Sequence, residues 1–439
     1  METVEALVAH IQGLSGNPDE VSHLHSLLKQ SEETLRLQVS RLAPFIKELD
    51  PAIHSLGYLY LLDAYSSGPI SGEHISSFHG YFVGFINSCS IEQIRLVSEK
   101  FISLCKRYKD QVIQQHVPIQ AVVPLRTAIR KIQSSSEQLT SLHPDFILVC
   151  LLSKYYKAAI SILDDDVFEI DQPKDFFLYC YYGGMIYIGL KQFPKALECL
   201  HNVVTAPMSA INSIAVEAYK KYVLVSLTHL GQISTFPKYT SSTAQRNLRN
   251  FAQPYVDLAN CYSNGKFSEL EEFIQANLEK FQADNNLGLV KQVLSSLYKR
   301  NIQRLTQTYL TLSLQDIADT VQLSTSKDAE LRVLQMIQDG DIFASINQKD
   351  GMVSFHEDPE QYKTCKMIEH VDSSIQRMMA LSKKLTEIEE HISCDPAYLS
   401  KIGRERPRFD FDDFDSVPHK FLNGGEGNGF LLLDSSAQF

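Results

Sequence analysis

The sequence lacks several features that would indicate a particular class of protein. It contains no tryptophan, which by itself excludes nothing. Its longest strongly apolar run, from about Phe176 to Leu190, falls short of the ~20 residues that a membrane-spanning helix needs and includes four tyrosines and two adjacent glycines. Glu2 and Glu5 stand where a signal peptide would carry basic residues. We therefore expect neither a membrane-spanning helix nor a secretory or transit signal.

Cysteine pairs with the spacing of a metal site are also missing. The eight cysteines are spread along the chain, and no two form a CxxC pair of the kind found in zinc fingers. Most lie in apolar segments such as LVCLLS and LECL, which favours buried thiols in a reducing compartment over disulfides. We predict no bound metal and no cofactor.

Positive charge is scarce relative to negative charge. The 439 residues include 41 Lys and Arg against 52 Asp and Glu, a formal net charge of −11. Phosphate backbones and anionic membrane surfaces attract positively charged proteins. The charge balance therefore argues against nucleic acid and membrane as partners.

Strand-like alternation is almost absent from the first 340 residues, whereas helical periodicity is present from the start. Apolar residues recur at spacings of three and four in VSHLHSLLKQSEETLRLQVSRLAPFI and in IEQIRLVSEKFISLCKRY. Pro51, Pro69 and Pro118 fall between such segments. This pattern predicts a mostly α-helical body that begins with helical repeats over residues 1–145.

A weak internal repeat occupies the middle of the chain. Three sets of residues share the same spacing: Tyr156, Ala159 and Leu163; Phe193, Ala196 and Leu200; Phe267, Leu270 and Ile274. The second copy resembles the tetratricopeptide pattern. Its small residues would let paired helices approach and its large residues would fill the seam; this predicted repeat core is Gly184, Tyr187, Phe193, Ala196 and Leu200. Because such units bury their apolar faces only when stacked, we predict a tetratricopeptide-like solenoid over residues 146–285.

The pattern changes after residue 300. Ser313 with Asp316, and Thr325 with Asp328, have the spacing of capping boxes that begin helices. Two short strands follow in DIFASI and MVSFH, on either side of the turn segment NQKDG. Three helices and a hairpin in this order predict a winged helix over residues 286–360.

A winged helix can bind DNA through its third helix. If Leu331, Leu334 and Ile337 face the core, the opposite face carries Asp328, Arg332, Gln335 and Asp339, with a net charge of −1. A helix that reads the DNA groove needs basic residues around it. We therefore favour a protein-docking module over a DNA-binding regulator.

The hairpin is the first candidate interface. Alternation places Ile342 on one face of the hairpin and Phe343 and Met352 on the other. An exposed edge of this kind suits the addition of a strand from a neighbouring protein, although a helix of the same chain could instead cover this face. The predicted contact residues are Asp341, Ile342, Phe343, Ser345, Asn347, Lys349, Met352, Ser354 and Phe355.

A long apolar stripe over residues 366–393 is the second candidate interface. It is too long to be covered by the hairpin alone, so we favour association with helices of other chains over packing on its own solenoid. The stripe consists of Met367, Val371, Ile375, Met378, Leu381, Leu385, Ile388 and Ile392. From Cys394 onward Pro, Gly, Ser and charged residues prevail, and residues 394–439 are predicted to be a disordered tail.

No catalytic motif passes a closer test. His23 and His25 form an HxH pair, but residues i and i+2 of a helix point apart. The positions where a metal-dependent isopeptidase carries Ser and Asp hold Glu33 and Arg36. We predict that the chain is not an enzyme.

Several longer segments, among them HSLGYLYLL, LTSLHPDF, FFLYCYYGGMIYIGLK, EAYKKYVLVSL and FASINQKDGMVSF, resemble the subunit 3 family of the COP9 signalosome in a plant-like form. The resemblance covers residues from about 1 to 415. It implies a PCI-type subunit, in which helical repeats lead into a winged helix and a C-terminal helix joins a shared bundle. It also implies a complex that removes Nedd8 from cullin–RING ubiquitin ligases, with the cleaving metal site in another subunit.

The resemblance further implies partners and location. The neighbours would be signalosome subunits 1 and 8, which would contact the hairpin and the C-terminal helix, and cullin–RING ligases would be reached through the complex. The location would be nucleus and cytoplasm. The rival interpretations are a PCI subunit of the proteasome lid or of a translation-initiation complex, and a winged-helix DNA-binding regulator.

Overall fold

The computed structural model describes residues 4–13, 18–67, 72–208, 211–357 and 364–405. It divides into two compact units, Met1–His356 and Glu357–Phe439, and each is treated by itself below. No helix among the described residues has the length and apolar character needed to cross a membrane.

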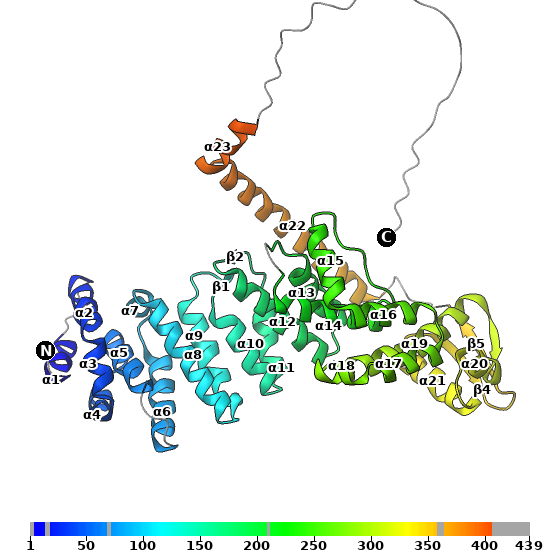
Figure 1. Cartoon of the computed structure of the whole chain (residues 1–439), viewed down its shortest axis with the longest axis horizontal. Helices are drawn as coiled ribbons and strands as arrows, with labels where there is room; N and C mark the ends of the chain where they lie inside the picture. Colours follow the sequence, from blue (N-terminus) through cyan, green and yellow to red (C-terminus); the bar gives the residue numbers. More distant parts are fainter. Residues whose placement is uncertain (1–3, 14–17, 68–71, 209–210, 358–363, 406–439) are drawn as a thin grey trace, which may run out of the picture. The chain divides into compact units, whose positions relative to one another are not determined.

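The first unit begins with helices that pack mainly on their neighbours in the chain (Figure 1). They are α1 (Val4–Gln12), α2 (Pro18–Gln30), α3 (Glu32–Leu37), α4 (Val39–Glu48), α5 (Ser55–Ser66), α6 (Gly72–Ser88), α7 (Ile91–Arg95), α8 (Ser98–Gln114), η1 (Pro118–Ala121) and α9 (Val122–Ile132). Helix α5 is mostly apolar, and all 12 of its residues are buried. It is the centre around which the neighbouring helices pack.

One charge inside α5 is balanced by basic residues of α8. The Asp63 side chain is only 3% exposed and lies 2.6 Å from Arg107 Nη2 and 3.2 Å from Lys100 Nζ. Arg107 also donates to the Asp63 carbonyl oxygen at 3.0 Å. A buried carboxylate is tolerated only with such partners, so this network fixes α8 against α5.

The middle of the unit continues the row of helices. Its elements are β1 (Gln138–Leu139), α10 (Leu142–Leu152), α11 (Tyr156–Leu163), β2 (Glu169–Ile170), α12 (Pro173–Gly189), α13 (Phe193–Thr205), α14 (Ser213–His229), α15 (Ser242–Phe251), α16 (Gln253–Ser263), α17 (Phe267–Ala276) and α18 (Leu278–Ala283). Strands β1 and β2 form a short parallel ladder.

The predicted repeat appears as a recurring turn. Each of its three copies begins a helix two residues after a residue of positive φ. The pairs are Lys154 and Tyr156, Lys191 and Phe193, and Gly265 and Phe267. In the second copy the Gln192 N–H donates to the Tyr187 carbonyl at 2.9 Å, as in a Schellman helix end. The repeat is thus a unit of local backbone geometry as well as of apolar spacing.

The predicted repeat core lies between α12 and α13. A Cβ atom at Gly184 would lie 2.9 Å from Leu200 Cγ, so a larger residue there would force the helices apart. Ala196, Leu200 and Tyr187 are buried, and Phe193 packs on the core while partly exposed. The small residues therefore allow the close approach that the sequence predicts.

The end of the first unit is the winged helix. It consists of α19 (Leu287–Thr308), β3 (Thr311–Ser313), α20 (Leu314–Val321), α21 (Ser326–Asp339), β4 (Phe343–Asn347) and β5 (Met352–His356). The sheet is antiparallel, in the order β3-β5-β4. The third strand, β3, was missed in the sequence because three residues are too short to show alternation.

The two helix starts predicted from this spacing are confirmed, each with the N-cap hydroxyl as acceptor. The Ser313 hydroxyl accepts from the Asp316 N–H at 3.0 Å, and the Thr325 hydroxyl accepts from the Asp328 N–H at 3.1 Å. Helix α21 ends at Gly340, whose φ of 76° favours glycine.

The second unit consists of α22 (Cys365–Ser393) and α23 (Pro396–Glu405). Helix α23 corrects the prediction that disorder begins at residue 394. Asp395 precedes it, and the Asp395 carboxylate accepts from the Ala397 N–H at 2.8 Å. Asp followed by Pro is a helix-start signal that the polar composition of the tail obscured. The rest of the predicted tail, 406–439, lies outside the described residues.

Candidate partner interfaces

One continuous helix joins the winged helix to the solenoid. The first half of α19 places Val290, Val293 and Leu297 in the main core, and its second half places Ile302 in the separate core of the winged helix. The Gln322 side chain accepts from the Phe267 N–H at 3.1 Å, at the start of α17. The sheet is therefore held in a fixed position relative to the repeats.

Strand β4 forms an open edge of the winged-helix sheet. Among the described residues it pairs with β5 alone, in a register that sets Ser345 opposite Ser354 and Asn347 opposite Met352. Phe343, at its start, is 42% exposed. Met352 and Ser354 lie in the central strand and are partly exposed. Their backbone lies between β3 and β4, so of the two hairpin strands only β4 has an open edge among the described residues.

Two residues of the predicted interface lie inside the domain instead. Ile342 is 5% exposed and Phe355 is 8% exposed, and both pack with Val353 in the core of the winged helix. Strand alternation turns them away from the surface. The prediction that Ile342 and Phe355 contact a partner was therefore wrong.

Several polar residues of the hairpin already have partners. Lys299 Nζ lies 2.8 Å from Asp341 and 3.0 Å from Asp339. Burial lowers the pKa of Lys299, but hydrogen bonds and the charges of these carboxylates outweigh it and raise the pKa above its ordinary value. The Asn347 side chain donates to Asp350 at 2.7 Å. Lys349 is exposed in the turn.

Helix α21 presents a different face from the one predicted. Ala329, Val333 and Met336 are buried, whereas Leu331 is 64% exposed and Leu334 is 43% exposed. The prediction that these leucines face the core was wrong. Apolar residues lie on both sides of this helix, so spacing alone could not distinguish two registers one residue apart.

The single arginine of α21 is already in contact with an aromatic ring. The Arg332 guanidinium lies over the Tyr298 ring at 5.7 Å, and Tyr298 stacks on Phe267 with ring centroids 4.2 Å apart. A phosphate-binding helix would need this charge and more. The exposed leucines suit a protein partner better.

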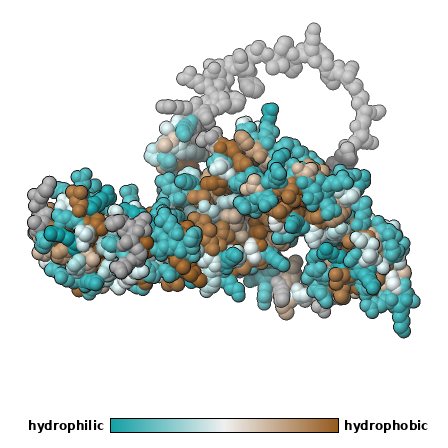
Figure 2. Space-filling model, turned by 60° about the horizontal axis from the view of Figure 1, so that its bottom comes forward, coloured by the Kyte–Doolittle hydropathy of each residue, from teal (hydrophilic) through white to brown (hydrophobic). Residues whose placement is uncertain are grey.

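The apolar stripe of α22 is exposed along its whole length. The exposed fraction is 72% for Met378 and 66% for Leu385, and every predicted residue of the stripe is at least 38% exposed. Ile368 and Met379 are exposed as well, which the prediction left out. Figure 2 shows that apolar side chains also reach the surface in patches on the face drawn there.

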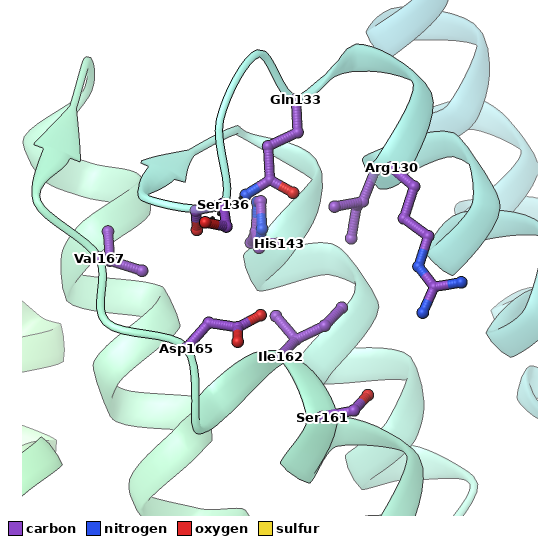
Figure 3. Close-up of a pocket in the computed structure, with 9 residues that line it drawn as sticks. Arg130, Gln133, Ser136, His143, Ser161, Ile162, Asp165 and Val167 are labelled. Carbon is purple, nitrogen blue, oxygen red and sulfur yellow. Dashed lines mark hydrogen bonds between the residues drawn. The ribbon is translucent and has the colours of Figure 1, made fainter.

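A pocket lies where several segments meet between α9 and α11 (Figure 3). Its lining comprises Ile129, Arg130, Gln133, Ser136, His143, Ser161, Ile162, Asp165 and Val167. His143 is only 2% exposed, and burial lowers its pKa to about 4. This pocket was not predicted from the sequence, because its lining is spread over residues 129–167 and carries no motif.

The pocket has no arrangement for covalent catalysis. The Ser161 hydroxyl donates to the Ala158 carbonyl oxygen at 3.1 Å, and the buried His143 hydrogen-bonds within its own turn. Among the residues that the structure describes, no group of three His, Cys, Asp or Glu side chains is placed to hold a metal ion. In the HxH pair, His23 is exposed and His25 lies 6.3 Å from the Tyr60 ring, so the two side chains diverge.

Comparison with known proteins covers nearly the whole chain. Residues 18–244 match the family described as "COP9 signalosome complex subunit 3, N-terminal helical repeats", and residues 273–357 match the PCI domain. COP9 signalosome complex subunit 3 of Arabidopsis thaliana is 57% identical over 423 residues, which cover 96% of this chain and 99% of the relative. The subunit of that name from Dictyostelium discoideum is 38% identical over 395 residues, 88% of this chain and 93% of the relative. The chain therefore belongs to the family of COP9 signalosome complex subunit 3.

Proposed function

We propose that this chain is a non-catalytic structural subunit of the COP9 signalosome, held in the complex by the edge of β4 and by the stripe of α22. Its neighbours in this proposal are subunits 1 and 8, and the complex removes Nedd8 from cullin–RING ubiquitin ligases in nucleus and cytoplasm. The observation that carries the proposal is the exposed stripe of α22. Family membership supplies the identity of the complex.

The spacing of the stripe favours a bundle of helices as its cover. Val371, Met378, Leu385 and Ile392 are seven residues apart, and Leu381 and Ile388 lie between them at the alternate three- and four-residue steps. This is the repeat of a helix whose seam packs into other helices. Burial of each large side chain contributes roughly 1.5–3 kcal/mol, although such values do not add up to a binding free energy.

The edge of β4 favours a neighbour that extends the sheet. Its outer side has no partner strand among the described residues, and Phe343 offers an apolar contact beside it. Main-chain hydrogen bonds would give affinity, and alternate side chains would give specificity. Because α19 fixes the sheet to the solenoid, a neighbour bound here would take a defined position relative to the repeats.

The rival interpretations fit fewer observations. A PCI domain alone would suit a proteasome-lid or translation-initiation subunit equally well, whereas the match over residues 18–244 is specific to the signalosome. A DNA-binding regulator would need several free basic residues on α21, but this helix carries only Lys327 and Arg332, and Arg332 lies over Tyr298.

Co-purification of a tagged chain with the other signalosome subunits tests the proposal. Met378→Glu with Leu385→Glu places two charges in the stripe and should abolish co-purification of the partner subunits. The control, Gln376→Glu with Thr386→Glu, adds the same charge to exposed positions outside the stripe and should leave assembly intact. Full assembly of the stripe variant would refute the role of α22.

A further inference from the structure

The turn between α11 and α12 is strongly acidic and belongs to neither proposed interface. Residues 164–171 (DDDVFEID) contain five carboxylates and no basic residue. Asp165, Glu169 and Asp171 are exposed. We call residues 164–171 the acidic segment. A run of this charge attracts basic groups, but charge alone does not define a binding site.

The acidic segment already binds one lysine of its own chain. Lys195 Nζ lies 2.7 Å from Asp164 Oδ1, and the Tyr187 hydroxyl donates to the same oxygen at 3.0 Å. Lys195 also lies over the Tyr187 ring at 5.5 Å. This contact shows how a basic side chain is held at one end of the segment.

The acidic segment also contains an open strand edge. Strand β2 pairs in parallel with β1 over two residues, Gln138 with Glu169 and Leu139 with Ile170. No further strand joins this sheet among the described residues. Ile170 is 41% exposed, whereas Leu139 of β1 is buried. Because two strands of this length are marginal alone, the exposed side of β2 is suited to accept a third strand.

A buried histidine faces the pocket at the start of these strands. Four of its lining residues lie shortly before the two strands. Gln133 and Ser136 precede β1, and Asp165 and Val167 precede β2 (Figure 3). The Thr140 N–H donates to His143 Nδ1 at 3.0 Å. A neutral ring that accepts at Nδ1 carries its proton on Nε2.

His143 therefore has an unused donor in the pocket. The contacts of its ring with polar groups of the described residues all involve Nδ1 and Thr140. The residue is 2% exposed and lines the pocket. A carbonyl oxygen that enters the pocket would supply an acceptor for the Nε2 proton. Arg130 lies at the opposite end of the pocket from Asp165 and Val167 (Figure 3) and can bind a second acceptor.

We propose that this surface binds an extended, basic segment of a partner protein. The segment adds as a strand beside β2, and its Lys or Arg side chains pair with Asp165, Glu169 and Asp171. Its end enters the pocket, where a main-chain carbonyl accepts from His143 Nε2. The charge of the acidic segment selects a basic sequence, and the open edge of β2 selects an extended one.

Binding of a labelled peptide of alternating arginine and valine to the full-length chain tests the proposal. The triple variant Asp165→Asn, Glu169→Gln, Asp171→Asn should bind about tenfold more weakly, because three partly exposed ion pairs are lost. The control Glu271→Gln, Glu272→Gln, Glu279→Gln removes the same charge from exposed positions elsewhere and should change affinity less than about twofold. Equal weakening by both variants would show non-specific attraction and overturn the proposal.

Two further arms test the strand and the histidine. A peptide of the same sequence, N-methylated at alternate residues, cannot pair as a strand and should lose binding; undiminished binding would contradict strand addition. His143→Asn keeps an acceptor for the Thr140 N–H but removes the donor at Nε2, so it should weaken binding, whereas His143→Gln should restore it. A peptide of residues 401–408 (KIGRERPR) tests whether this chain itself is the occupant. If it binds more tightly than the labelled arginine–valine peptide and displaces it, the proposal of a partner protein is overturned.

Discussion

Helices α8 and α22 have the same kind of amphipathic sequence but different surroundings. Helix α8 buries Phe101, Leu104, Cys105, Tyr108 and Val112 against other helices of its unit. Helix α22 carries a stripe of similar character, and none of it is buried. The periodicity of a sequence identifies which side chains need a cover, but it does not identify the chain that supplies the cover. The contrast predicts that substitutions in α8 destabilise the isolated chain far more than substitutions in the stripe of α22.

The largest effect is expected from a cavity in the covered helix. Phe101→Ala removes a ring that is 0% exposed and should lower the free energy of unfolding by about 3–5 kcal/mol. Leu385→Ala, in the exposed stripe, should change it by less than about 0.5 kcal/mol. Chemical denaturation of the isolated chain measures both. A comparable loss in Leu385→Ala would mean that the stripe is covered within the chain.

A somewhat smaller effect is expected at the ion pairs between α5 and α8. Asp63→Asn leaves Lys100 and Arg107 without their shared carboxylate and should cost about 3 kcal/mol. Lys383→Gln removes one partner of an exposed pair on α22, at 4.0 Å from Glu387, and should cost less than about 0.5 kcal/mol. Denaturation midpoints of the two variants give the comparison, and equal midpoints would contradict it.

Acid should destabilise the first unit through His143. Its pKa is lowered by burial to about 4 in the folded chain from 6.5, so the unfolded chain binds a proton first as the pH falls. The His143 contribution to stability is complete above pH 6.5 and is lost between pH 6.5 and 4, with a slope of up to about 1.4 kcal/mol per pH unit. His143→Asn should flatten this part of the stability profile. An unchanged slope in the variant would assign the effect to other groups.

The smallest effect concerns the repeated turn of the body. Lys191 has a φ of 58°, which costs a residue with a Cβ atom roughly 1 kcal/mol. Lys191→Gly should therefore raise stability by about that amount, whereas Lys191→Ala, which keeps the Cβ atom, should not. Thermal unfolding of the two variants measures the difference. If both variants were more stable, the gain would come from removal of the lysine charge and not of the Cβ atom.

The sequence predicted most of the architecture for identifiable reasons. Ser313 and Thr325 marked helix starts that form the expected hydrogen bonds. The repeat positions Tyr156, Phe193 and Phe267 each begin a helix. Such features depend on neighbours within about seven residues, which a sequence displays directly.

The features that were missed depend on distant or ambiguous information. Leu331 and Leu334 were assigned to the core because α21 carries apolar residues on two adjacent faces. Strand β3 is recognisable only through its pairing with β5. The pocket at His143 brings together segments that are separate in the sequence. Each of these features can be recognised only from the tertiary structure, because the local spacing of residues does not specify it.

Hydrogen exchange of the α22 amides, Cys365–Ser393, tests most directly whether partner subunits bury the stripe. We expect these amides to exchange rapidly in the isolated chain, since a helix without tertiary packing is marginal in water, and at least about a hundredfold more slowly in the purified signalosome. The α8 amides should be protected in both. Strong protection of α22 in the isolated chain, or none in the complex, would contradict the account.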